Sequence, residues 1–274
     1  MKTAFGLDIA GYSTGKSGFV RADRKDNNSI EITVFRRHAF AEKCGAKTPL
    51  DDDIVKNEKE LLIACCKKGC LLVDIPIDLQ ELPCPNNVKF IWELVKRPVD
   101  FAFGAMSPLA ERIGYPVARF LKLFSSIKDE FEEPLGKQIF ETYPAGSLKL
   151  LKSQIPNLPF NRYKKQQAEF KNGCWNGGQL AQIAQGLKLT PEISITLNDD
   201  ELDAIICAIT GVVDDEYCLQ GNELTNKINS LISNGKPYPA PNGYVLLKKR
   251  PEIKINITTK IVKNQKEMLK EVAR

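Results

Sequence analysis

The chain has 274 residues, of which 43% are hydrophobic and 27% are charged, as is ordinary for a globular protein with a sizeable core. No apolar stretch approaches the roughly 18 to 20 residues that span a bilayer, and Asp8 interrupts the apolar N-terminus, unlike a secretion signal. We therefore expect a cytoplasmic protein that is not bound to a membrane. The formal net charge of +5 is compatible with nucleic acid as a partner but does not by itself indicate one.

The first part of the chain predicts an antiparallel meander. Residues 3 to 9 and 19 to 22 are short apolar strands, and residues 30 to 35 alternate between apolar and polar side chains. Residues 51 to 68 predict an amphipathic helix, and the continuous apolar run at residues 70 to 76 suits a central strand buried on both faces. Three antiparallel strands, a crossover helix and a parallel strand are the opening half of an RNase H-like α/β fold, a mixed sheet flanked by helices.

The later part of the chain predicts an insertion and further elements of the same domain. Residues 80 to 135 are rich in proline, with a helical stretch near residues 108 to 124, and are interpreted as an insertion over the sheet edge. Strands are predicted at residues 137–143 and 243–247, and helices at 145–152, 178–189 and 200–213. Residues 1–248 would form one domain and residues 249–274 a basic tail, for which an arm for nucleic acid and a flexible or partner-binding end are both open.

The eight cysteines do not form a metal or disulfide pattern. The tightest group, Cys65, Cys66 and Cys70, lacks the paired two-residue spacing of a zinc ribbon. The single histidine, His38, does not complete such a site. Free buried thiols are therefore the favoured interpretation.

Acidic side chains lie within or at the ends of the predicted strands and at the start of a predicted helix. Asp8 lies inside the first strand, Asp74 closes the central strand, and Glu141 lies at the end of a later strand. Asp200 and Asp203 are three residues apart at the start of a helix, so they project from one face. Burying an unpaired carboxylate costs several kcal/mol, and basic residues are scarce beside these positions. A bound Mg²⁺ or Mn²⁺ would compensate, because both prefer oxygen ligands.

Each of these acids also has an ordinary structural interpretation. Asp8 or Asp74 could cap a turn through a side-chain hydrogen bond. Asp199 is interpreted as the N-cap of the helix, directly before the pair Asp200 and Asp203. Glu141 is equally consistent with a ligand and with a hydrogen-bonded structural acid. Their joint occurrence favours a metal site more than any one of them does.

Four segments in this order resemble a known family: Gly6-Leu7-Asp8-Ile9-Ala10-Gly11, Val73-Asp74-Ile75-Pro76-Ile77, Phe140-Glu141-Thr142-Tyr143-Pro144 and Asp199-Asp200-Glu201-Leu202-Asp203-Ala204. The family is the prokaryotic domain of unknown function 429, described as predicted nucleases of the RNase H fold, and the resemblance covers residues 3–248. The two helix acids are also similar to those of Holliday-junction resolvases of the RuvC type. The resemblance implies metal ligation by Asp8, Asp74, Asp200 and Asp203. One departure is Asp74, where RNase H-like nucleases often carry Glu.

These observations predict a metal-dependent nuclease that hydrolyses phosphodiester bonds with two ions about 3.5 to 4 Å apart. Glu141 would orient water or the second ion. Phosphate contacts are predicted for Lys16, Arg97, Lys164 and Lys165. The run at residues 162–165 interleaves an aromatic side chain with cations, which suits stacking and phosphate neutralisation, although such runs are more commonly solvated loops. DNA and RNA both remain open as substrates.

A P-loop NTPase is disfavoured, whereas a phosphotransferase and a non-catalytic binding protein remain open as alternatives to the nuclease. Residues 10–17 fit a relaxed phosphate-binding loop, but such a loop precedes a helix and residues 18–21 predict a strand. An ATP-dependent phosphotransferase of the sugar kinase or actin-like type is the alternative, because Thr14-Gly15-Lys16 after the first strand resembles a phosphate hairpin. Its second phosphate hairpin is not recognisable. A non-catalytic nucleic acid-binding protein is the third possibility, which the retention of every required acid argues against.

Overall fold

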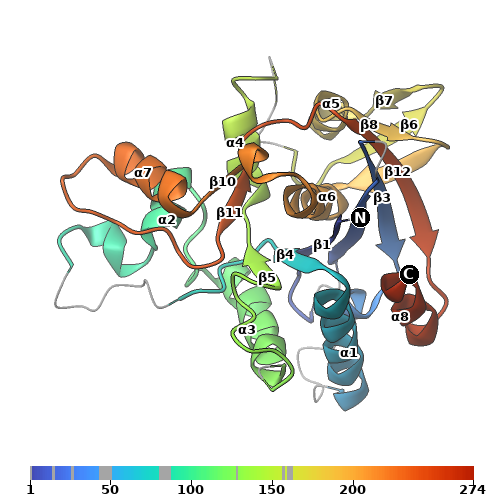
Figure 1. Ribbon diagram of the computed structural model, residues 1–274, viewed down its shortest axis with the longest axis horizontal. Helices are drawn as coiled ribbons and strands as arrows, with labels where there is room; N and C mark the ends of the chain where they lie inside the picture. Colours follow the sequence, from blue (N-terminus) through green and yellow to red (C-terminus); the bar gives the residue numbers. More distant parts are fainter. Residues whose placement is uncertain are drawn as a thin grey trace.

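The computed structural model describes residues 2–13, 16–25, 28–42, 51–79, 88–127, 129–155, 158 and 163–274. They form a mixed α/β structure around a seven-stranded sheet with the order β5-β4-β1-β2-β3-β12-β8 (Figure 1). The strands of this sheet are Lys2–Asp8 (β1), Gly18–Arg24 (β2), Ser29–Arg36 (β3), Cys70–Val73 (β4), Ile139–Glu141 (β5), Leu189–Pro191 (β8) and Lys254–Ile261 (β12).

The pairing within the sheet matches the predicted sequence of elements. Strands β1, β2 and β3 pair antiparallel, β4 lies parallel to β1, and β5 lies parallel to β4. The crossover from β3 to β4 contains helix α1, Asp52–Lys68, whose N-terminus is capped by the Asp51 side chain. Because β2 begins at Gly18, a strand and not a helix follows residues 10–17, as expected for a chain without a phosphate-binding loop of the NTPase type. Residues 14–15 of that segment lie outside the described residues.

The interpretation of residues 249–274 as a separate basic tail is wrong. Strand β12 pairs in parallel with β3 along its whole length and with β8 on its other side. Ile255 and Ile257 are fully buried, while the lysines of the strand point away from the core. Helix α8, Gln265–Ala273, follows and packs against α1 (Figure 1). The C-terminal segment is therefore an internal part of the sheet.

Helices cover both faces of the sheet because the side chains of its strands alternate. In β1, Phe5 and Leu7 belong to a core shared with α1, α3 and α8, whereas Ala4 belongs to the core on the other face. The helices outside α1 and α8 are Pro98–Phe103 (α2), Glu111–Ser126 (α3), Pro144–Leu151 (α4), Gly178–Gly186 (α5), Asp199–Val212 (α6) and Gly221–Ile232 (α7). Helix α6 lies across β1 and β2 on the Ala4 face.

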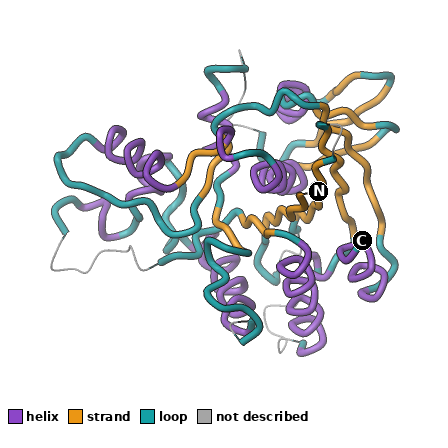
Figure 2. Tube along the Cα trace, viewed as in Figure 1, coloured by secondary structure: helices purple, strands orange, loops and turns teal. Residues whose placement is uncertain are grey.

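Smaller elements extend this body on two sides (Figure 2). One side has a three-stranded sheet of Gln167–Lys171 (β6), Cys174–Asn176 (β7) and Ile195–Asn198 (β9). The other has the pair Cys218–Gln220 (β10) and Val245–Leu247 (β11), which shares a third core with α2 and α7. Short 3-10 turns occur at Ala39–Ala41, Ile91–Leu94 and Asp215–Tyr217. None of the helices in the described ranges is long and apolar enough to cross a membrane.

Candidate functional site

Helix α6 approaches the sheet so closely that only glycine fits beneath it. A Cβ atom at Gly6 of β1 would lie 1.9 Å from the carbonyl oxygen of Ala204, and one at Gly18 of β2 would lie 2.0 Å from that of Asp200. Any larger residue at either position would push the helix away. The two glycines therefore place the first turns of α6 directly over β2 and over β1, the strand that ends at Asp8.

The N-terminus of α6 is fixed by a capping box. The Asn198 side chain accepts a hydrogen bond from the Glu201 amide at 2.8 Å, and the Glu201 carboxylate accepts one from the Asn198 amide at 3.0 Å. The interpretation of Asp199 as the cap is wrong by one residue. The Asp199 carboxylate instead accepts a hydrogen bond from the Lys165 amide at 2.8 Å, which ties the segment before β6 to the helix.

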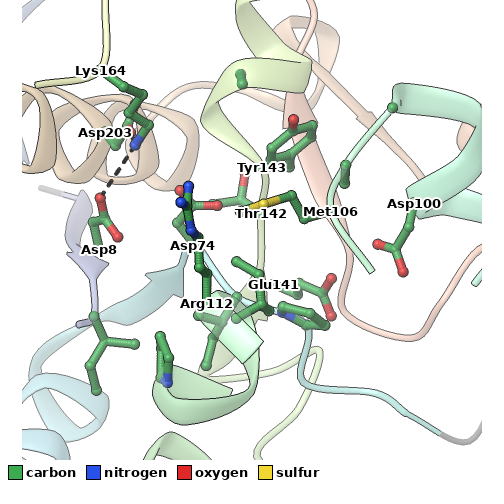
Figure 3. Close-up of a pocket in the computed structure, with 18 of the residues that line it drawn as sticks. Asp8, Asp74, Asp100, Met106, Arg112, Glu141, Thr142, Tyr143, Lys164 and Asp203 are labelled. Carbon is green, nitrogen blue, oxygen red and sulfur yellow. Dashed lines mark hydrogen bonds and ion pairs between the residues drawn. The ribbon is translucent and has the colours of Figure 1, made fainter. Parts of the chain in front are cut away.

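Three of the predicted acids meet at this end of the sheet. Asp8, Asp74 and Asp203 each offer a carboxylate oxygen, and the three oxygens lie within 4.8 Å of one another (Figure 3). The parallel strands β1 and β4 bring the first two together, and the amide of Asp74 donates to the carbonyl of Leu7 at 3.0 Å. Helix α6 supplies Asp203, whose side chain is fully buried. We call Asp8, Asp74 and Asp203 the acidic triad.

Burial leaves the acidic triad short of compensating positive charge. Burial and mutual repulsion raise the pKa of Asp74 to about 8. Burial also raises the pKa of Asp8 and of Asp203, and the charge of Lys164 opposes both shifts. Among the described residues, one cation opposes the pKa shifts of all three carboxylates, and it does not offset their desolvation.

That cation is Lys164, and it corrects the expectation that basic residues are scarce around these acids. Its ammonium group forms an ion pair with Asp203 and lies 3.8 Å from an oxygen of Asp8 (Figure 3). Burial opposes the charge of Lys164, but the surrounding carboxylates outweigh it and raise its pKa. The Lys164 side chain is 51% exposed, so it can move away, whereas Asp203 cannot.

Tyr163 serves the triad rather than a substrate. Its hydroxyl donates to the second carboxylate oxygen of Asp203 at 2.7 Å, and its ring is 1% exposed. The predicted stacking of bases on this ring is therefore wrong. Arg162, in the same run, lies outside the described residues.

Asp200 and the remaining predicted cations lie at the edge of the site. Asp200 lines the same cleft, but in the described part of the chain the acidic triad does not include it. Burial and the neighbouring Asp199 raise the pKa of Asp200 to about 6, and the charges of Lys164 and, more weakly, Lys16 oppose this. Lys16 and Lys165 are both exposed. Both lie near the acids that begin α6, since the charge of Lys16 acts on Asp200 and the Lys165 amide binds Asp199, and their exposure leaves them available to an anionic ligand.

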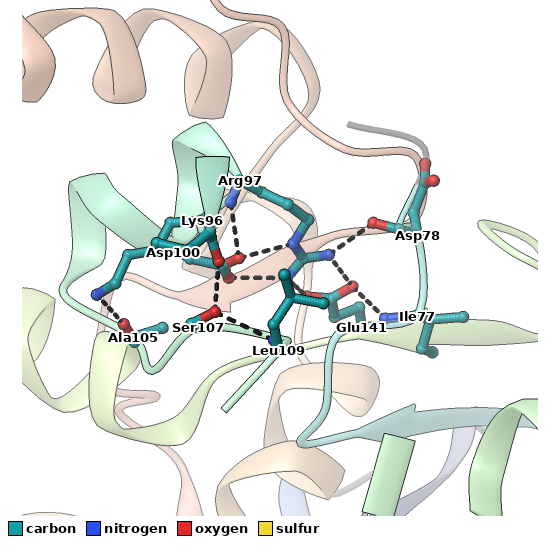
Figure 4. A network of polar contacts seen from close by, with 10 residues as sticks. Ile77, Asp78, Lys96, Arg97, Asp100, Ala105, Ser107, Leu109 and Glu141 are labelled. Atoms are coloured by element: carbon teal, nitrogen blue, oxygen red, sulfur yellow. Dashed lines mark hydrogen bonds and ion pairs between the residues drawn. The ribbon is translucent and has the colours of Figure 1, made fainter. Parts of the chain in front are cut away.

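Arg97 and Glu141 form a buried ion pair, which agrees with the structural interpretation of Glu141 and not with a phosphate contact by Arg97 (Figure 4). Arg97 is 1% exposed, and its guanidinium binds Asp100 and both oxygens of Glu141. Burial raises the pKa of Glu141, and Arg97 opposes that shift. With both oxygens engaged, Glu141 is held as a structural acid and Arg97 as its counter-ion. Sequence alone could not pair them, because 44 residues separate them.

The same network shapes the chain that follows Asp74. A carboxylate oxygen of Glu141 accepts a hydrogen bond from the Ile77 amide at 2.8 Å, and Arg97 donates to the carbonyl of Asp78 at 2.9 Å (Figure 4). Arg97 lies just before α2, in the predicted insertion. The insertion is thus joined to the sheet at the point where β4 and β5 end, next to the acidic triad.

The acidic triad lies in a cleft of about 580 Å³ with two different walls. Lys164 and Asp200 line one side. Met106 and Arg112, from the connection between α2 and α3 and from the start of α3, line the other and project into the cleft (Figure 3). Sequence reasoning missed this second wall, and the proline-rich composition of the insertion gave no signal for it.

Comparison with known proteins adds no assignment to this geometry. No family model matches the chain, and neither the curated proteins nor the solved structures contain a match to it. The resemblance to the domain of unknown function 429 therefore stays a prediction from the four sequence segments.

Proposed function

We propose that the chain is a divalent-metal-dependent nuclease with an RNase H-like fold. The observation that carries this proposal is the acidic triad, three carboxylates brought together at the ends of two parallel strands and on one helix. The fold assignment is supported by the antiparallel run β1 to β3, followed by α1 and by β4 in parallel beside β1.

The chemistry of the donor set fits Mg²⁺ or Mn²⁺. Carboxylate oxygens are the ligands that these ions prefer, and the triad has too little positive charge around it, as the raised pKa of Asp74 indicates. Asp8, Asp74 and Asp203 would hold the ion. When bound, it would polarise a phosphoryl oxygen and make a water molecule more acidic. The second ion expected from the sequence would depend on Asp200 and stays a prediction.

The neighbouring side chains have distinct parts in this proposal. Tyr163 keeps Asp203 oriented through its hydroxyl. Lys164 would leave Asp203 for a substrate phosphate, since its side chain is half exposed. Lys16 and Lys165, both exposed and near the acids that begin α6, would neutralise the adjoining phosphates.

The test is cleavage of a panel of single-stranded, duplex, hybrid and branched DNA and RNA with Mg²⁺ or Mn²⁺. We expect cleavage that requires the metal and is lost in Asp8→Asn and in Asp203→Asn. The matched control is Asp215→Asn, which makes the same chemical change at an exposed acid of a 3-10 turn and should cleave normally. Full cleavage by folded Asp8→Asn, or no cleavage of any substrate by the unaltered chain, would refute the proposal.

A further inference from the structure

The described residues expose their large apolar side chains mainly on one segment. Of the ten that are strongly exposed, seven lie between residues 91 and 115. Three of these lie on the stretch that contains the cleft-lining residues Met106 and Arg112: Met106 is 52% exposed, Leu109 62% and Tyr115 66%. Single exposed apolar residues are normal, but a concentration at one place marks a binding surface. We call Met106, Leu109 and Tyr115 the apolar rim.

The apolar rim is continuous with the wall opposite Lys164. Met106 itself lines the cleft, as do Arg112 and Pro116 on the first turns of α3. Tyr115 reaches the chain that leaves β1 after Asp8, since a Cβ atom at Gly11 would lie 3.1 Å from the Cβ of Tyr115. Met106 and Tyr115 therefore stand near the acidic triad, and Leu109 lies between them in the sequence.

The two walls offer complementary chemistry. Lys164 presents its ammonium group on one side, with the exposed Lys165 and Lys16 near the acids that begin α6, and such cations suit a phosphate backbone. The other side presents apolar and aromatic side chains together with the exposed guanidinium of Arg112, which suit the faces of nucleobases. A ligand that carries phosphates along one edge and unpaired bases along the other matches both walls.

We propose that the substrate of this cleft is single-stranded nucleic acid, with its phosphates toward Lys164 and its bases against the apolar rim. The inference rests on the proposed nuclease function and names its substrate class. A duplex is a poorer match because its base faces are stacked inside it and unavailable to the rim. The cleft volume of about 580 Å³ is also in the range that encloses one small ligand, which corresponds to a nucleotide unit of an open strand.

The test is a fluorescence anisotropy titration of a short labelled oligonucleotide, alone and annealed to its complement, with Asp8→Asn protein in Mg²⁺. We expect the single strand to bind at least about tenfold more tightly than the duplex. Tyr115→Ala and Leu109→Ala should each weaken single-strand binding about fivefold or more, because the first loses base stacking and the second loses apolar contact with a base. Tyr115→Phe should retain it. The matched control is Ile193→Ala, 65% exposed between β8 and β9, which should bind normally.

Binding of the duplex as tightly as the single strand, or unchanged single-strand binding by Tyr115→Ala and Leu109→Ala, would overturn the inference. The cleavage panel separates this result from failure of the proposed function. Metal-dependent cutting of duplex alone would keep the nuclease and refute the single-stranded substrate. Single-strand binding that depends on the apolar rim, with no cutting of any substrate, would refute the nuclease and support the binding surface.

Discussion

Replacing Arg97 with methionine tests whether this arginine is structural or contacts a substrate. Methionine keeps the length of the side chain but removes its charge. The side chains of Arg97, Asp100 and Glu141 are 1%, 3% and 2% exposed, so the change leaves two buried carboxylates without their counter-ion. Removing one partner of a buried ion pair costs about 3 to 5 kcal/mol. Against a typical unfolding free energy of about 5 to 15 kcal/mol, this is a large fraction.

The assay is urea unfolding, followed by circular dichroism, of a double-mutant cycle. In the Glu141→Gln background one of the two carboxylates is already neutral, so Arg97→Met should cost less there, with a coupling energy of about 1 kcal/mol or more. The matched control is Arg112→Met, an exposed arginine of the same cleft, which should change stability by no more than about 0.5 kcal/mol. Near-native stability of Arg97→Met together with weakened nucleic acid binding would refute the structural assignment.

Three further predictions concern stability. Burial lowers the pKa of His38 from 6.5 to about 4. As the pH falls, the unfolded chain therefore binds a proton at His38 before the folded chain does, and about 3 kcal/mol of stability should be lost between pH 6.5 and pH 4. A proton NMR titration of this single histidine with a midpoint near 6.5 would contradict it. Gly6→Ala should destabilise the fold by about 3 kcal/mol or more in thermal melts, because the backbone of α6 must move, whereas Gly114→Ala, with open space around it, should not. Lys164→Gln should lower the melting temperature measured without metal, because Asp203 loses its counter-ion. It should also enlarge the rise in melting temperature that Mn²⁺ produces, because the ammonium group and the ion compete for Asp203. An unchanged rise would argue against that competition.

The sequence predicted the strands and helix that carry the acidic triad because their patterns are local. The apolar residues around Asp8 indicate β1, the continuous apolar run before Asp74 indicates β4, and the acids three residues apart before an apolar run indicate the start of α6. The alternation in β3 likewise indicates a strand, although β3 carries no residue of the triad. The same alternation was present in β12, where Ile255 and Ile257 are two residues apart. Because lysines flank these isoleucines, the sequence alone favours a basic tail. Charged residues on one face of a strand do not, however, prevent it from pairing with neighbouring strands.

The parts of the site that depend on tertiary contacts could not be predicted. Lys164 is 39 residues from Asp203, so nothing local marks it as the counter-ion of the triad. Arg97 looked available for phosphate because a lone arginine in an irregular segment is usually exposed. Asp100 is a local partner three residues away, but Glu141 of β5 is 44 residues away and only the folded chain brings it to Arg97.

The place of β12 also has a consequence for handling the protein. The eight residues of β3 have β2 on one side and β12 on the other. A chain that loses the C-terminal segment to truncation or proteolysis would expose one whole edge of β3, and an unpaired edge of that length is a template for pairing with another molecule. If the lysine-rich C-terminal segment were removed to weaken nucleic acid binding, we would therefore expect the truncated protein to aggregate during expression.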